Sequence, residues 1–215
     1  MTAAAFADRI RDAATVILLD RDAPGGPSVL MGMRGAAAAF MPSKYVFPGG
    51  AVDPEDAALP ATPVLGDACR VRLNAEPRMD SDVTPDALAT AALRELVEET
   101  GLVMAPDRPA SLIFVFRAVT PPGRTRRFDA RFFLIDARDV AGDRCDFSSA
   151  CVELSHLHWV SLAEARALDL PFITEVVLAE IEELARAARD APLMPPATVP
   201  FFDNRDGEPR FVQLS

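Results

Sequence analysis

The chain has 215 residues, of which 50% are hydrophobic and 25% are charged, a composition that suits a single well-packed domain. Acidic residues outnumber basic residues by 32 to 22, and the resulting net charge of −10 argues against general binding to nucleic acid or to an anionic membrane surface. No run of about 18 apolar residues is present, so we expect no membrane-spanning helix.

The first part of the chain is typical of a hairpin that leads toward a glycine turn. Residues 15–19 form a short apolar run that predicts a buried strand, turn-forming residues follow, and residues 28–33 predict a second strand that Arg34 closes. Further on, Gly49 and Gly50 stand side by side. Because glycine lets a backbone approach a ligand closely, a main-chain carbonyl left unpaired at such a turn can bind a metal ion.

Residues 57–83 contain Pro60, Pro63 and Pro77 and one short predicted helix, over residues 64–73. The segment has no periodic apolar face long enough to form a separate domain. We interpret it as an excursion beside the functional site that could narrow the choice of ligand, with a passive surface loop as the alternative.

A helix is predicted to begin at Thr84 and to end at Gly101. Thr84 is a favourable N-cap, Pro85 suits the first helical position, and Asp86 places an acid in the first turn. Gly101 is expected to end the helix, because glycine readily adopts the left-handed conformation found after a helix C-terminus.

Three glutamates share one face of this predicted helix. Glu95, Glu98 and Glu99 are spaced i, i+3 and i+4, and like charges one turn apart weaken a helix unless Arg94 or a bound cation lies among them. Carboxylates with no Cys or His nearby suit Mg²⁺ or Mn²⁺. A solvated acidic face is the alternative interpretation. The opposite, packed face is expected to consist of Leu93, Leu96, Val97 and Thr100.

Two further strands are predicted over residues 112–116 and 127–135. The first is continuously apolar, as in a central strand, and the second alternates in polarity. Its two faces are Phe128, Ala130, Phe132 and Leu134 on one side and, for the most part, Arg127, Asp129 and Arg131 on the other. Residues 121–127 between the strands form a dense positive loop. This loop could bind a ligand with several phosphates, since guanidinium groups bind phosphate in bidentate fashion, or it could be a solvated hairpin.

Residues 151–160 contain His156 and His158, which could share a strand face and bind a metal ion. Surface histidines are the preferred interpretation, because the glutamates favour an ion with oxygen ligands. A capping box at Ser161 and Glu164 predicts the start of a helix.

The last part of the chain predicts an amphipathic helix to about residue 189 and a strand over residues 211–214, and Pro192, Pro195, Pro196 and Pro200 break regular structure after the helix. The apolar stripe of the helix consists of Ile173, Val176, Val177, Ile181 and Leu184. Such a stripe is typical of a core or of a contact between two copies, so we treat a homodimer as an open alternative to a monomer.

Residues 45–50 (Tyr-Val-Phe-Pro-Gly-Gly) and 94–102 (Arg-Glu-Leu-Val-Glu-Glu-Thr-Gly-Leu) together resemble the signature box of the Nudix hydrolases. That box reads Gly-x5-Glu-x7-Arg-Glu-U-x-Glu-Glu-x-Gly-U, where U is apolar. Residues 94–102 fit it at every defined position. The interrupted box, preceded by Phe40-Met41-Pro42, is similar to the branch that includes the peroxisomal coenzyme A diphosphatases.

The first half of the box departs from the pattern. Asp56 stands where the box has its first glutamate, and 37 residues separate it from Arg94 where the box has seven. Asp86 stands seven residues before Arg94 and could supply the missing acid instead. The sequence leaves both alternatives open.

The resemblance implies the Nudix fold, a mixed β-sheet in an α/β/α sandwich with a loop-helix-loop box. We expect a single domain over residues 1–215, with an insertion at about 57–83 and a C-terminal helical extension at about 161–215. The implied activity is Mg²⁺-dependent or Mn²⁺-dependent hydrolysis by water of a diphosphate bond in a nucleoside diphosphate-linked small molecule. Coenzyme A or an acyl derivative is the leading substrate. The alternatives are ADP-ribose, a dinucleotide, a damaged nucleotide, and a ligand-binding relative without catalysis.

The resemblance also implies residue roles. Arg94 would hold the glutamates in place through Glu98 at i+4, and Glu153, six positions before Trp159, or a box glutamate would take the proton from water. The expected catalytic residues are Arg94, Glu95, Glu98, Glu99 and Glu153; the metal ligands are these four glutamates and the Gly49 carbonyl; and the substrate contacts are Arg34, Arg124, Arg126 and Arg127.

The three cysteines, Cys69, Cys145 and Cys151, have neither metal-ligand spacing nor an even disulfide framework. The charged residues within segment 1–14 leave no apolar centre for a signal peptide. We therefore expect reduced thiols and a cytoplasmic location.

Overall fold

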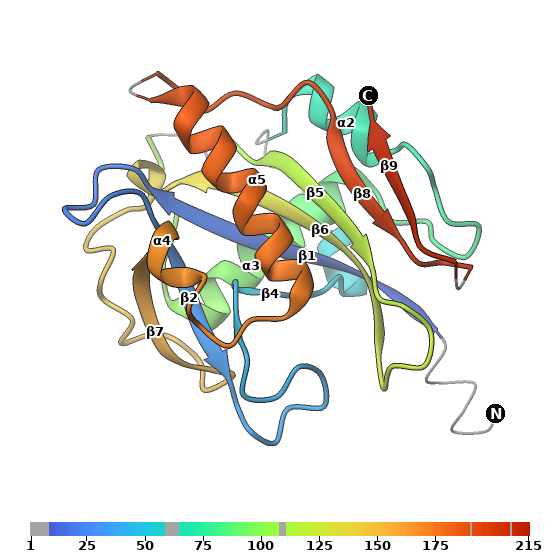
Figure 1. Ribbon diagram of the computed structural model, residues 1–215, viewed down its shortest axis with the longest axis horizontal. Coiled ribbons are helices and arrows are strands. Elements are labelled where there is room, and N and C mark those ends of the chain that lie inside the picture. The colour runs from blue at the N-terminus through green and yellow to red at the C-terminus, as the bar shows by residue number, and fades with distance from the viewer. Residues whose placement is uncertain (1–8, 59–64, 108–110, 190, 207) are drawn as a thin grey trace.

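The computed structural model describes residues 9–58, 65–107, 111–189, 191–206 and 208–215. In these residues the strands form one nine-stranded mixed sheet, in the order β3-β2-β1-β6-β5-β8-β9, with β4 paired to β1 and β7 paired to β2 (Figure 1). The elements are β1 (Ile10–Asp20), β2 (Ser28–Arg34), β3 (Tyr45–Val46), β4 (Gly49–Ala51), η1 (Pro54–Ala57), α2 (Asp67–Leu73), α3 (Pro85–Thr100), β5 (Ile113–Val119), β6 (Arg127–Asp136), η2 (Ala137–Asp139), β7 (Leu154–Ser161), α4 (Leu162–Ala165), α5 (Phe172–Ala188), β8 (Val199–Asp203) and β9 (Arg210–Leu214).

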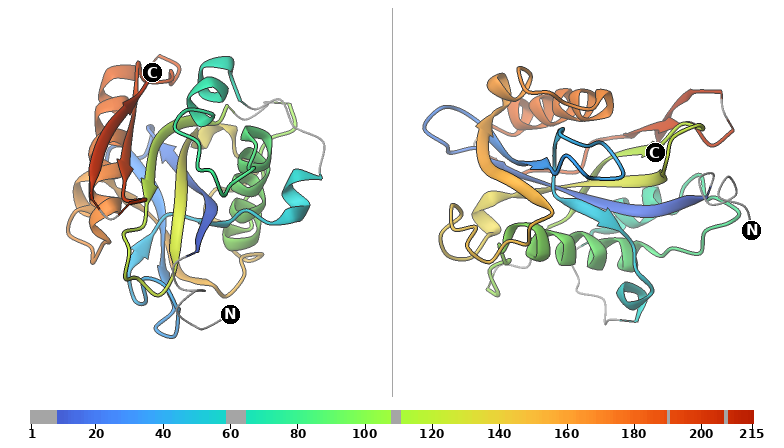
Figure 2. Two further views of the ribbon diagram at one scale, coloured as in Figure 1. Left: turned by 90° about the vertical axis from the view of Figure 1, so that its right-hand side faces the viewer. Right: turned by 90° about the horizontal axis from the view of Figure 1, so that it is seen from below.

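Helices cover both faces of the sheet, with α5 on one side and α3 on the other (Figure 2). Successive side chains of β1 enter the two cores alternately, as the period of a strand requires. Val16 and Leu18 pack on the side of α3, and Ile17 and Leu19 pack on the side of α5, all four fully buried. The expected α/β/α sandwich is confirmed.

The four strands predicted in the first two thirds of the chain are confirmed, each as part of a longer or slightly shifted strand. The predicted helix is confirmed as α3. Thr84 Oγ1 accepts a hydrogen bond of 3.1 Å from a first-turn N–H, and Gly101 ends the helix at φ 74°. The expected packed face is confirmed for Leu96, which is fully buried, but is wrong for Val97, which is 43% exposed. Val97 lies about 200° around the helix from Glu95, and it is the Glu95 side that packs against the sheet.

The insertion contributes to the core. Its predicted helix is confirmed as α2, beginning at Asp67, with Cys69 and Leu73 buried. Arg70 forms an ion pair of 2.7 Å with Asp86 in the first turn of α3. This part of the insertion therefore lies at the opposite end of α3 from the glutamates; Pro60 and Pro63 fall outside the described residues.

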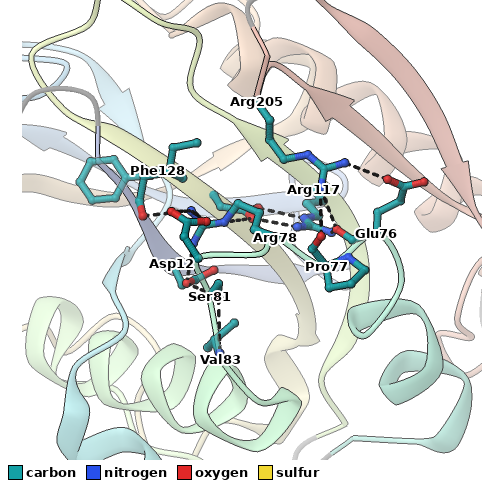
Figure 3. A network of polar contacts seen from close by, with 12 residues as sticks. Asp12, Glu76, Pro77, Arg78, Ser81, Val83, Arg117, Phe128 and Arg205 are labelled. Carbon is teal, nitrogen blue, oxygen red and sulfur yellow. Dashed lines mark hydrogen bonds and ion pairs between the residues drawn. The ribbon is translucent and has the colours of Figure 1, made fainter.

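A buried ionic network joins the end of the insertion to the sheet (Figure 3). Arg78 donates to Asp12 at 2.7 Å and forms an ion pair with Asp129 at 3.0 Å. Arg117 donates to both oxygens of Asp129, at 2.9 and 2.8 Å, and to two main-chain carbonyls of the insertion. Burial raises the pKa of Asp129, but the hydrogen bonds from Arg117 and the charge of Arg131 outweigh it and lower that pKa overall. The charged face of β6 is therefore buried.

The C-terminal region adds strands as well as helices. Ser161 caps α4 by accepting from the Glu164 N–H, which confirms the predicted capping box. After α5, β8 pairs in parallel with β5, and β9 forms the predicted return strand along the edge of the sheet. No helix in the described parts of the chain is both long enough and apolar enough to cross a membrane.

Candidate active site

The last turns of α3 lie directly against the glycine pair at the start of β4 (Figure 2, right). The Gly49 N–H donates to Glu99 Oε2 at 2.7 Å. A Cβ on Gly50 would lie 2.6 Å from Glu95 Cδ, and a Cβ on Gly49, where φ is 153°, would lie 2.6 Å from the Cα of Thr15. The absence of a side chain at Gly50 therefore lets α3 approach β4, and its absence at Gly49 lets β4 lie against β1.

Arg94 organises the acidic side chains. Its Nη1 donates to Glu95 Oε1 at 2.8 Å and to Glu98 Oε2 at 3.0 Å, which confirms the expected contact at i+4. Its Nη2 also donates to the Ala51 carbonyl at 3.0 Å, which ties the helix to β4. The hydrogen bond to Asp56, and then the one to Glu95, raise the pKa of Arg94 further above its ordinary value, so this side chain is a permanent cation within the group.

Asp56 completes the arrangement from η1. Its two oxygens accept from Nε and Nη2 of Arg94, both at 2.9 Å, in a bidentate pair. Asp86 lies elsewhere, paired with Arg70 of α2. Of the two alternatives, the structure therefore brings Asp56 to the box, across the insertion.

Sequence reasoning missed Asp53, which lies 3.8 Å from Arg94. It caps η1, and its own N–H donates to Asp56 Oδ2 at 2.8 Å. The signal was present as Asp-Pro-Glu-Asp over residues 53–56, a capping box with proline at the first helical position.

Glu99 is a buried carboxyl group of which only one oxygen has a hydrogen-bond partner in the described structure. It is 1% exposed, and its Oε1 is buried without a hydrogen-bond partner in the described structure. Burial first, and then the nearby charges of Glu95 and Glu153, raise its pKa to about 8, despite the hydrogen bond from Gly49. Burial likewise raises the pKa of Glu95. A buried oxygen without a partner among several carboxylates is the environment that a hard divalent cation would stabilise.

The carboxylates are not gathered around a common centre. Among the described residues, no three acidic, His or Cys side chains stand close enough together to hold an ion. Arg94 draws Glu95 and Glu98 to itself, and Gly49 holds one oxygen of Glu99. The carboxylate donors fit Mg²⁺ or Mn²⁺ in chemistry, although their side chains are held by Arg94 and Gly49 and not arranged as a ligand set.

Glu153 reaches this group from the segment before β7. The Cys151 N–H donates to the Glu98 carbonyl at 2.8 Å and fixes this segment to the end of α3. Arg34, at the end of β2, donates from Nη2 to Glu153 Oε1 at 2.7 Å. The charges of both side chains act on the pKa of Glu99. Arg34 and Glu153, 119 residues apart in the chain, are thus brought together at the glutamates.

The positive loop of residues 121–127, called the basic loop below, lies partly at the surface and partly in the interior. Arg124 and Arg126 are exposed, whereas Arg127 is 4% exposed. The Arg127 guanidinium donates to the carbonyls of Thr120 and Asn204, both at 2.9 Å, and so links the β5–β6 hairpin to the turn after β8. The expectation that Arg127 binds substrate is wrong, because its donors are used by the main chain inside the protein.

The exposed part of the basic loop packs beside the loop that follows Arg34. Thr125 Oγ1 donates to the Ala39 carbonyl at 2.9 Å, and the rings of Phe40 and Phe128 meet edge to face at 5.0 Å.

His158 packs its ring on Tyr45 at 5.7 Å, as expected of a surface histidine rather than a metal ligand. A hollow of about 330 Å³ elsewhere contains none of the predicted site residues; it is lined by Ser111, Ile113, Asp136, Arg138, Asp139, Pro192 and Leu193.

Comparison with solved structures gives similar folds over most of the chain. A Nudix hydrolase from Alicyclobacillus acidocaldarius has 26% identity and a TM-score of 0.60, and the alignment covers 87% of this chain and 99% of that one. The chain has the fold of the Nudix hydrolases.

Two more distant structures share the fold alone. The Nudix domain of Shewanella oneidensis NrtR, complexed with ADP ribose, has 13% identity and a TM-score of 0.53, covering 81% of this chain and 88% of that one. A Nudix hydrolase from Nitrosomonas europaea has 13% identity and a TM-score of 0.51, covering 81% and 90%. Comparisons with protein-family profiles and with curated proteins find no match.

Proposed function

We propose that this protein is a Nudix hydrolase that cleaves the diphosphate bond of a nucleoside diphosphate-linked small molecule by attack of water, with Mg²⁺ or Mn²⁺ as cofactor. The observation that carries the proposal is the buried Glu99 oxygen without a partner in the described structure, in a side chain that is bound to Gly49 and lies within the influence of the Glu95 and Glu153 charges. A structural acid would be expected to have both oxygens satisfied or exposed.

In this proposal Glu95, Glu98, Glu99, Glu153 and the Gly49 carbonyl would hold the ion. When bound, the ion supplies charge neutralisation for the diphosphate and activation of water. Arg94 keeps the box carboxylates in place through its contacts to Glu95 and Glu98. A carboxylate of this group, with Glu153 as the candidate because it is half-exposed, takes the proton from water.

Coenzyme A or an acyl derivative is the leading substrate in this proposal. It carries a diphosphate and a further phosphate, and Arg124 and Arg126 provide exposed cations on a loop that packs against the loop after Arg34. ADP-ribose is the main alternative, since the Nudix domain of NrtR binds it. A dinucleotide remains a third candidate.

The proposal is tested by product analysis in ¹⁸O-labelled water with Mg²⁺, using coenzyme A, ADP-ribose and a dinucleotide in parallel. We expect one labelled phosphate product from one preferred substrate. Glu98→Gln and Glu99→Gln should each lower kcat by about 10² to 10⁴-fold with the thermal midpoint retained. Glu175→Gln, on the exposed face of α5, is the matched control and should leave kcat unchanged. Near wild-type turnover in both box variants would refute the proposal.

A further inference from the structure

The candidate site contains more acids than bases. Four glutamates and Asp56 share two arginines, and each arginine is already engaged with an acid. Arg94 contacts Asp56, Glu95 and Glu98, and Arg34 contacts Glu153. A cation or an anion that enters must therefore compete with an existing ion pair.

The main chains that carry the Arg34–Glu153 pair are fixed. The Arg34 N–H donates to the Lys44 carbonyl at 3.0 Å, and the Arg34 carbonyl accepts from the Ser43 N–H at 3.1 Å. Leu154, directly after Glu153, is paired with Arg34 in the β2–β7 register. Any rearrangement of the pair is consequently a movement of two side chains and not of their strands.

Each member of the pair has capacity beyond this one contact. Arg34 Nε is buried and has no hydrogen-bond partner in the described structure. The Glu153 side chain is 53% exposed, and only one of its oxygens accepts from Arg34. Because the Glu153 charge also acts on Glu95 and Glu99, this carboxylate lies within the field of the proposed metal ligands.

We propose that the Arg34–Glu153 ion pair is an exchangeable contact that breaks when cation and diphosphate bind. This inference rests on the proposed function. Glu153 turns to the cation and Arg34 turns to the anionic diphosphate, so both are positioned by one event. Since either ligand alone must break the same pair, the first to bind removes that cost for the second. The pair thereby couples metal binding to substrate binding.

The test measures binding and not turnover. Mn²⁺ affinity is determined by electron paramagnetic resonance of the free ion, without substrate, for the wild type, Arg34→Gln, Glu153→Gln and the double variant. Lys44→Gln is the matched control. Lys44 lies at the other end of the loop that begins after Arg34, carries the same charge, and pairs with Asp169 instead of a glutamate of the site.

We expect Arg34→Gln to bind Mn²⁺ about fivefold more tightly than the wild type, the amount that a partly exposed ion pair is worth. Lys44→Gln should change the Kd by less than about twofold. In the Glu153→Gln background, Arg34→Gln should have no further effect. Equal Kd values for Arg34→Gln and Lys44→Gln, or weaker Mn²⁺ binding in Arg34→Gln, would overturn the exchange.

A second measurement keeps the inference testable if Arg34→Gln does not fold. Glu153→Gln should bind methylenediphosphonate about fivefold more tightly in the absence of metal, because Arg34 is released. Unchanged affinity contradicts the exchange. If wild-type protein binds no Mn²⁺ at all, the proposed function fails, whereas Mn²⁺ binding without the Arg34 effect defeats only the inference.

Discussion

Gly50→Ala is expected to damage the active site while leaving the fold almost intact. A Cβ at this position would lie 2.3 Å from Glu95 Oε1, and ordinary contact begins at 3.4 Å, so the carboxylate must retreat by about 1.1 Å. Gly50 is not among the residues with positive φ, so the alanine causes no backbone strain. A displacement of about 1 Å in a catalytic constellation costs on the order of 10²-fold in rate. We expect kcat/KM to fall by about 10²-fold.

The assay compares kcat/KM with the free energy of unfolding from urea denaturation. Gly50→Ala should destabilise the protein by about 1 to 2 kcal/mol, the usual cost of one extra methyl in a packed place. Gly25→Ala is the control, because nothing lies within 4 Å of its added Cβ, and both quantities should stay near the wild type. Wild-type kcat/KM in folded Gly50→Ala would show that the place of Glu95 beside the glycine turn is irrelevant to the reaction.

Three further predictions concern stability. Arg78→Met leaves the fully buried Asp129 short of one partner and should lower the free energy of unfolding by about 3 to 5 kcal/mol in urea denaturation; a loss below 1 kcal/mol would contradict a buried network. Burial raises the pKa of Asp203, but the hydrogen bonds from Arg205 outweigh it and lower this pKa from 3.8 to about 2. The ionised side chain therefore adds about 2 kcal/mol to the free energy of unfolding above pH 3.8, and this contribution is lost as the pH falls through 2. The deficit of Asp203→Asn measured at pH 7 should accordingly shrink on acidification, and a deficit independent of pH would refute this. Thr84→Ala removes the N-cap of α3 and should cost about 1 kcal/mol, whereas an unchanged thermal midpoint would show that the cap is dispensable.

The sequence predicted the box helix well because its signals are local. The cap at Thr84, the stop at Gly101 and the contact from Arg94 to Glu98 all lie within a few turns of one another. The meeting of this helix with the glycine pair followed from the resemblance, and the structure shows its physical basis in the absence of a side chain at Gly50.

The sequence-based predictions were wrong or incomplete where segments distant in the chain determine the surroundings of a side chain. The position of Arg127 in a basic run gave no sign that the turn after β8, with Asn204, would enclose its guanidinium. The alternation in β6 predicted two faces but not that Arg78 would arrive from the insertion to bury Asp129. Asp56 could not be chosen by counting residues, since the insertion separates it from Arg94.

The burial of Arg78 limits how this insertion can be exchanged between relatives. Its side chain shares Asp12 of β1 and Asp129 of β6, two positions that belong to the sheet and not to the insertion. A chimera that receives a foreign segment in place of residues 65–83 would keep both acids and lose one of the cations that pair with them. Grafting would therefore succeed only if the recipient strands were changed together with the graft.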